Sequence, residues 1–146
     1  MGVLLALALV SAVLPGLACG DTGRSARNAL VVFERSGGIA GSLDRLVIQP
    51  KGKARLTTRA HPEGTRFRVE RRTLRRLRSL LDRAQLGTLD PSYEGEEVVR
   101  DDIDFQITHD GHTVQTAGTA APPRLDAVLA LLQRIVDRHG RRVQTR

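Results

Sequence analysis

The hydrophobic pattern changes its period at about Arg71, and this change constrains the fold more than any other feature of the sequence. Before it, apolar residues alternate with polar ones in short runs, which is typical of strands with one buried face. After it, apolar residues recur at helical spacing from Leu74 to Ala84. A chain with both periods must pack a sheet against helices.

The alternating runs predict four strands in the first half, at about 29–35, 43–49, 54–58 and 66–70. A Pro-Lys-Gly turn follows Gln49, and we predict a loop for His61-Pro62-Glu63-Gly64. A helix should follow from about Arg71 and end near Gly87, where a C-terminal glycine belongs.

The second half begins with a segment at 88–100 that we predict to be a polar, acidic loop, followed by two strands and a helix. Residues 102–107 alternate, and Asp110-Gly111 is a strong signal for a two-residue hairpin. This turn would pair His109 with His112. Pro122-Pro123 should open a last helix that ends at Gly140 and whose single apolar stripe packs on a sheet.

The elements therefore follow the order β-β-β-β-α-β-β-α. Tight hairpins imply antiparallel strands, and helices with one apolar side imply packing on one face of the sheet. We predict an α+β fold with a single domain at 29–140, and a basic tail at 141–146.

The N-terminal segment predicts export. Residues 3–14 are almost wholly apolar, and Pro15 and Gly16 break the run, so it is too short to span a bilayer as a helix. Residues 1–19 thus resemble a signal peptide, and residues 20–28 a flexible tether. Cleavage before Cys19 would give a lipid-modified, membrane-anchored lipoprotein, whereas cleavage after Gly20 would give a secreted protein.

The net charge is +7, and its basic and acidic residues lie in separate clusters. Seven arginines occur in residues 66–78 and seven acids in residues 90–104, so we expect the two clusters to neutralise each other within the fold. The alternative partner is an anionic envelope polymer or lipid that meets Arg72, Arg75 and Arg76. We do not expect nucleic acid, because the protein is exported and stacking aromatics are scarce.

Candidate catalytic and metal chemistry is sparse. His109 and His112 would be cross-strand neighbours, but no third metal ligand has a matching spacing. The acids of 90–104 lack the ligand spacing of a calcium loop, and no serine lies in a nucleophile elbow. We therefore predict no catalytic residues, metal or cofactor, and a protein that is not an enzyme.

Three glycines within five residues end the first strand. Gly37, Gly38 and Gly41 enclose Ile39 and Ala40, and glycine is favoured where the backbone needs positive φ or another surface approaches closely. A glycine turn that holds an apolar residue predicts a loop shaped for contact.

The sequence resembles the emfourin family, small protein inhibitors of thermolysin-like metalloproteases such as protealysin. The resemblance lies in the first strand with its Arg-Ser-Gly-Gly element at 35–38, in the first helix at 74–86, in the strand at 101–107, and in the last helix after Pro122-Pro123. It covers roughly residues 29–139.

The resemblance implies an inhibitor whose glycine loop blocks a protease cleft, and the N-terminal segment, which departs from a typical small member of the family, adds the expectation of export. Ile39 would be the apolar anchor and Arg35 a contact at the rim of the cleft, with residues 90–100 as a second contact surface. The contact loop would comprise Arg35, Ser36, Gly37, Gly38, Ile39, Ala40 and Gly41. The alternative is an envelope-binding module that uses the arginine face of the first helix.

Overall fold

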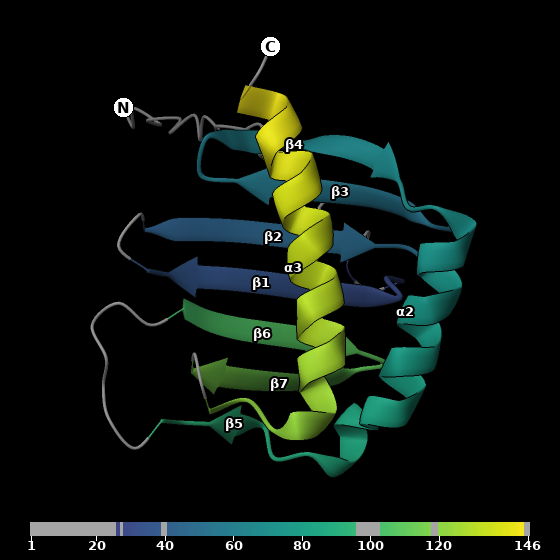
Figure 1. Ribbon diagram of the computed structural model, residues 1–146, viewed down its shortest axis with the longest axis vertical. Coiled ribbons are helices and arrows are strands. Elements are labelled where there is room, and N and C mark those ends of the chain that lie inside the picture. Colours follow the sequence, from purple (N-terminus) through teal and green to yellow (C-terminus); the bar gives the residue numbers. More distant parts are fainter. Residues whose placement is uncertain (1–25, 27, 39–40, 96–102, 118–119, 145–146) are drawn as a thin grey trace, which may run out of the picture.

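The computed structural model describes residues 26, 28–38, 41–95, 103–117 and 120–144. Seven strands form one sheet in the order β4-β3-β2-β1-β6-β7-β5, and every neighbouring pair is antiparallel except β5 with β7 (Figure 1). The strands are β1 (Val31–Gly37), β2 (Ser42–Ile48), β3 (Lys53–Thr58), β4 (His61–Arg68), β5 (Ser92–Tyr93), β6 (Ile103–His109) and β7 (His112–Ala117).

Two helices cover the same face of this sheet, which confirms the predicted α+β architecture. Helix α3 (Pro123–Gln144) crosses the strands, whereas α2 (Arg71–Ala84) lies at the end of the sheet opposite the β1–β2 turn (Figure 1). A single 3₁₀ turn, η1 (Leu86–Thr88), follows α2. In the described part of the chain, no helix is long and apolar enough to cross a membrane.

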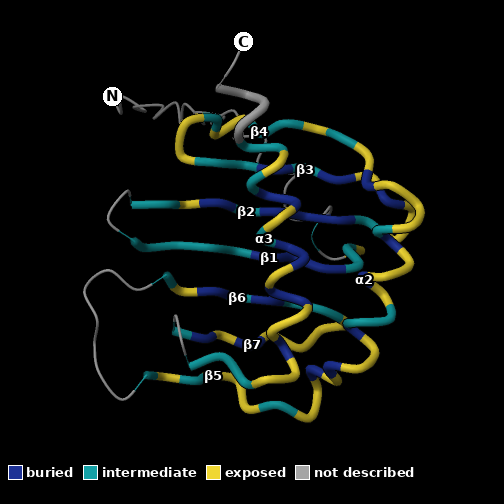
Figure 2. The backbone as a smooth tube through the Cα atoms, viewed as in Figure 1, coloured by how far each residue is buried: buried dark blue, intermediate teal, exposed yellow. Residues whose placement is uncertain are grey.

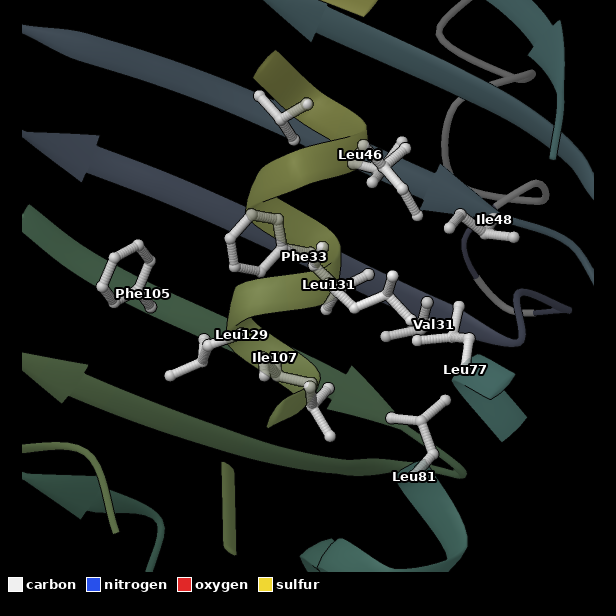
Figure 3. Close-up of a cluster of buried hydrophobic side chains, with 14 of the residues drawn as sticks. Val31, Phe33, Leu46, Ile48, Leu77, Leu81, Phe105, Ile107, Leu129 and Leu131 are labelled. Atoms are coloured by element: carbon white, nitrogen blue, oxygen red, sulfur yellow. The ribbon is translucent and has the colours of Figure 1, made fainter. Parts of the chain in front are cut away.

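The hydrophobic core lies between the sheet and the two helices (Figures 2 and 3). Phe33 of β1 stacks on Phe105 of β6 with ring centroids 6.0 Å apart. Leu77 of α2 and Leu132 of α3 are fully buried in the same core. The apolar stripes predicted for the helices are therefore the surfaces that close the core.

The predicted hairpin between β6 and β7 is confirmed in its register. His109 pairs with His112, and Ile107 pairs with Val114. Asp110 and Gly111 take φ values of 49° and 79°, as a two-residue turn with positive φ at both central positions requires.

The loop predicted at His61-Pro62-Glu63-Gly64 is wrong, because these residues begin β4. Thr58 pairs with His61 across a two-residue turn, and the register then shifts between Leu56 and Thr58. Pro and Gly are tolerated here because β4 is an edge strand and the pairing is irregular.

Three further boundaries differ from the sequence prediction. Helix α2 ends before Gly87, because Gln85 adopts the left-handed conformation (φ 48°) and its N–H bonds to Leu81. Gly140 does not end α3, which continues to Gln144 through most of the predicted tail. The segment predicted as an acidic loop at 88–100 contains the short strand β5, and η1 ends at its first residue, Thr88.

Candidate functional site

The β1–β2 hairpin ends in a tight turn built on glycines. Gly37, Gly38 and Gly41 all have positive φ, at 96°, 71° and 56°. The N–H of Gly41 donates to the carbonyl oxygen of Gly38 at 2.9 Å, which closes the turn. Ile39 and Ala40, which complete the predicted contact loop, lie outside the described residues, as does Cys19.

Neighbouring elements hold this turn on both sides. A Cβ atom on Gly38 would lie 3.3 Å from Cγ1 of Ile103, and one on Gly41 would lie 2.7 Å from Nη1 of Arg59. The same Arg59 nitrogen donates to the carbonyl oxygen of Gly41 at 3.3 Å. The positive φ values therefore favour glycine at both positions, and the Ile103 side chain leaves little room for a Cβ at Gly38.

Arg35 lies on β1 two residues before Gly37 and joins the hairpin to helix α3. Its Nε and Nη2 both donate to Oδ2 of Asp44 on β2, at 2.9 and 2.7 Å. Its Nη1 donates to Oδ1 of Asp137 on α3 at 3.0 Å. We call these three residues the Arg35 cluster.

The Arg35 cluster keeps the guanidinium charged. Burial acts to lower the pKa of Arg35, but the hydrogen bonds and charges of Asp44, and then those of Asp137, outweigh it and raise the pKa above its ordinary value. Only 17% of the Arg35 side chain is exposed. This residue of the predicted contact loop therefore serves as an internal brace of the hairpin in the described structure.

Leu43 is an exposed apolar residue that the sequence reasoning missed. It follows the glycine turn on β2, and 63% of it is exposed, which makes it the single exposed large hydrophobic residue among those described. Its position in the alternation explains the exposure: Leu46 and Ile48 face the helices, so Leu43 points to the opposite face. The same alternation was available in the sequence.

A cavity of about 770 Å³ lies beside Leu43. Most of its lining side chains belong to the sheet face that the helices leave open, and they are mainly polar. Ser36 from the predicted contact loop lines it together with Tyr93 and Glu94. The fold thus brings the glycine hairpin and the described start of the predicted second contact surface to one cavity.

One ion pair and one hydrogen bond link neighbouring strands at the floor of this cavity. Nε of Arg45 on β2 lies 3.2 Å from Oε1 of Glu34 on β1. The amide of Gln115 donates to the side-chain oxygen of Gln106 at 2.7 Å across β6 and β7. The open face is therefore a cross-linked polar surface beside an apolar side chain.

His109 and His112 take structural roles in the described fold. The Nδ1 of His109 lies 2.6 Å from the carbonyl oxygen of Leu30 and donates to it. The ring of His112 packs over Gly87, where a Cβ atom would approach its Nε2 to 3.0 Å. In the ranges that the structure describes, no three His, Cys, Asp or Glu side chains group as metal ligands.

Four acids of the predicted acidic cluster lie outside the described residues, so the expected neutralisation of the arginines stays a prediction: they are Glu96, Glu97, Asp101 and Asp102. Glu94 and Asp104 line the cavity beside the hairpin, whereas α2 lies at the other end of the sheet (Figure 1). The described acids form no ion pair with any arginine of α2. Arg72 and Arg76 line a groove between the helices, and Arg75 is exposed outside that groove.

No protein-family model matches the sequence, and a search of curated proteins found no match. The resemblance to emfourins therefore remains a prediction from the residues quoted above.

Proposed function

We propose that this protein inhibits a thermolysin-like metalloprotease by placing its β1–β2 hairpin in the catalytic cleft. The observation that supports this most is a braced glycine turn with an exposed leucine beside it. The resemblance to emfourins supplies the class of target, and the hairpin supplies a surface that suits a groove.

The hairpin is held in place before any partner arrives. Arg35 joins strand β1 near the turn to α3, and Arg59 joins the glycine turn to the β3–β4 turn. Fixing a loop in one conformation reduces the entropy that binding must overcome. Arg35 therefore positions the hairpin and does not itself contact the rim of the protease cleft. Residues beside it would make that contact.

Two apolar side chains would then contact the enzyme. The resemblance assigns the tip residue Ile39 to the main pocket, since thermolysin-like enzymes prefer bulky apolar side chains there. Leu43 lies two residues beyond that turn and would be covered by the rim of the cleft. Such apolar contacts near the centre of an interface usually dominate its affinity.

The cavity beside Leu43 would form the second contact. Tyr93 and Glu94 stand on its far side from the hairpin strands β1 and β2, so a protein surface resting on Leu43 would also meet β5. The hydroxyl of Tyr93 accepts a hydrogen bond from the N–H of Asp90 at 3.0 Å, which orients its ring. This arrangement supports the earlier assignment of the 90–100 segment as a contact surface.

The test is the inhibition constant of hairpin variants against a thermolysin-like protease. Burying a leucine side chain contributes about 1.5–3 kcal/mol, so covering the 63% that is exposed should contribute about 1–2 kcal/mol. Leu43→Ala should therefore weaken inhibition about five- to thirtyfold. Ile39→Ala should reduce the free energy of binding to the protease by at least about 1 kcal/mol.

Leu43→Met is the matched control, because it keeps an apolar side chain of similar volume at the same position. It should inhibit nearly as well as the natural protein. Inhibition should also persist at high salt, since screening weakens charge-driven binding but not an apolar contact. If both alanine variants stay within about twofold of the natural protein, the hairpin is not the inhibitory element.

A further inference from the structure

A second candidate site lies between the two helices, away from the hairpin. A groove of about 410 Å³ separates the N-terminal half of α2 from the C-terminal half of α3, where β4 ends. Buried Leu131 and Ile135 of α3 contribute to its wall. Five arginines line it against a single carboxylate, that of Glu70: they are Arg68, Arg72, Arg76, Arg134 and Arg138.

These arginines lack acidic partners in the described part of the chain. Arg68 donates to the carbonyl oxygen of Lys51 at 3.2 Å, and Arg134 donates to that of Ala130 at 3.1 Å. Arg72, Arg76 and Arg138 have no ion pair with a described acid. The groove thus holds a concentration of positive charge that the described fold does not neutralise.

The spacing of the arginines increases this imbalance. Arg72 and Arg76 stand four residues apart on α2, and Arg134 and Arg138 stand four residues apart on α3. Like charges at this spacing lie on one helix face and repel each other. One anion bound between the two helices would reduce the repulsion within both pairs.

The start of α2 adds to the positive potential of the same groove. Glu70 precedes the helix, but its side chain does not cap the free N–H groups, and the first turn contains no acidic residue. The N–H groups of the first turn therefore have no side-chain cap, and the carboxylate of Glu70 is the single negative charge that the groove sets against the helix dipole and the five arginines. The arginine groove, rather than this helix end alone, defines the site.

We propose that the groove binds a phosphate group of a small anionic ligand. Guanidinium groups bind phosphate oxygens through paired N–H donors, and donors on two facing helices suit a tetrahedral group with several charged oxygens. A soluble phosphate ester and an anionic lipid headgroup share this chemistry. The site is distinct from the proposed protease contact, because α2 lies at the opposite end of the strands from the glycine turn.

The test uses two probes on the full chain. Inorganic pyrophosphate represents a soluble ligand and is titrated by calorimetry. Vesicles of phosphatidylglycerol represent a headgroup and are used in a sedimentation assay, with neutral phosphatidylcholine vesicles for comparison. Binding of pyrophosphate assigns the groove to soluble phosphates, and binding of the anionic vesicles alone assigns it to headgroups.

Two variants with equal charge change separate a groove from general attraction. Arg72→Gln/Arg76→Gln removes the α2 side of the groove, whereas Arg71→Gln/Arg75→Gln removes two exposed arginines of the same helix that do not line it. The groove variant should weaken binding at least tenfold, and the control should stay within about threefold. Circular dichroism checks that both variants fold.

A third variant tests whether both helices contribute. Arg134→Gln/Arg138→Gln should weaken binding as much as the groove variant on α2. Equal losses in the groove and control variants would show attraction by net charge and overturn the proposal. Absence of binding to both probes at low salt would also overturn it.

Discussion

Replacement of Arg35 by Met should remove the brace that joins the hairpin to α3. Arg35 makes two hydrogen bonds to one oxygen of Asp44 and one to Asp137. The Asp44 side chain is only 11% exposed, whereas that of Asp137 is 45% exposed. The substitution would leave the Asp44 carboxylate nearly buried and without this cation.

The expected cost lies between those of exposed and buried ion pairs. Removing one partner of a fully buried pair costs about 3–5 kcal/mol, and an exposed pair contributes about 0–1 kcal/mol. Because some solvent reaches the cluster, we expect Arg35→Met to lower the free energy of unfolding by about 2–3 kcal/mol. Asp137→Asn, at the exposed end, should cost about 0–1 kcal/mol.

Urea unfolding followed by circular dichroism measures both changes. The double variant Arg35→Met/Asp44→Leu is the control, because replacing both charges by apolar groups removes the stranded carboxylate and should recover most of the loss. The reasoning is refuted if Asp137→Asn costs as much as Arg35→Met, or if Arg35→Met costs less than about 0.5 kcal/mol.

Three further outcomes follow from the structure. The pKa of Arg35 is raised in the folded state, so the charged side chain stabilises the fold fully at any pH below its unfolded-state pKa. This contribution is lost only as the pH rises through the folded-state pKa. The cost of Arg35→Met should therefore be equal at pH 7 and pH 9, and unfolding curves at both values check this. Thr116→Val should raise the free energy of unfolding by about 1 kcal/mol, because the hydroxyl is buried without a hydrogen-bond partner; a loss in urea unfolding would contradict this. Gly64→Ala should lower the free energy of unfolding by about 1 kcal/mol or more beyond the loss caused by Gly111→Ala. Both glycines have positive φ, but a Cβ atom at Gly64 would lie 2.9 Å from Nε of Arg55, whereas one at Gly111 would meet nothing within 4 Å. Equal thermal midpoints for the two alanine variants would contradict that difference.

The sequence contained enough information to predict the layers of the fold. Alternation marks one face of β2, β3 and β6, and the helical stripes from Leu74 and from Leu125 mark the surfaces that cover it. The Asp110-Gly111 turn also determines the register of its hairpin. These features depend on local spacing, so one sequence suffices to identify them.

Features that depend on tertiary contacts could not be predicted in this way. Strand β5 has two residues and a parallel partner, β7, that follows it by about twenty positions, so no local pattern marks it. His61-Pro62-Glu63-Gly64 has the composition of a loop, but pairing with β3 makes it a strand. Tertiary pairing overrode local preference there.

The candidate site also combines one feature that local spacing predicts with contacts that only the folded chain creates. The glycine turn was evident from spacing, and its positive φ values agree with that interpretation. The contact of Arg35 with Asp137 joins residues 102 positions apart, and no pattern indicates it. The groove between α2 and α3 likewise requires the antiparallel packing of two helices, although three of its five arginines lie in the arginine cluster at 66–78 that stood out in the sequence.

The most direct test of the central proposal is a titration of a purified thermolysin-like metalloprotease with the purified domain. Residual hydrolysis of a small peptide substrate is measured as the molar ratio increases, with the protease held well above the expected dissociation constant. Occupation of the cleft predicts that activity falls linearly and reaches its minimum at one domain per enzyme. Full activity at a large molar excess, with no complex on gel filtration, would contradict the proposal for that enzyme.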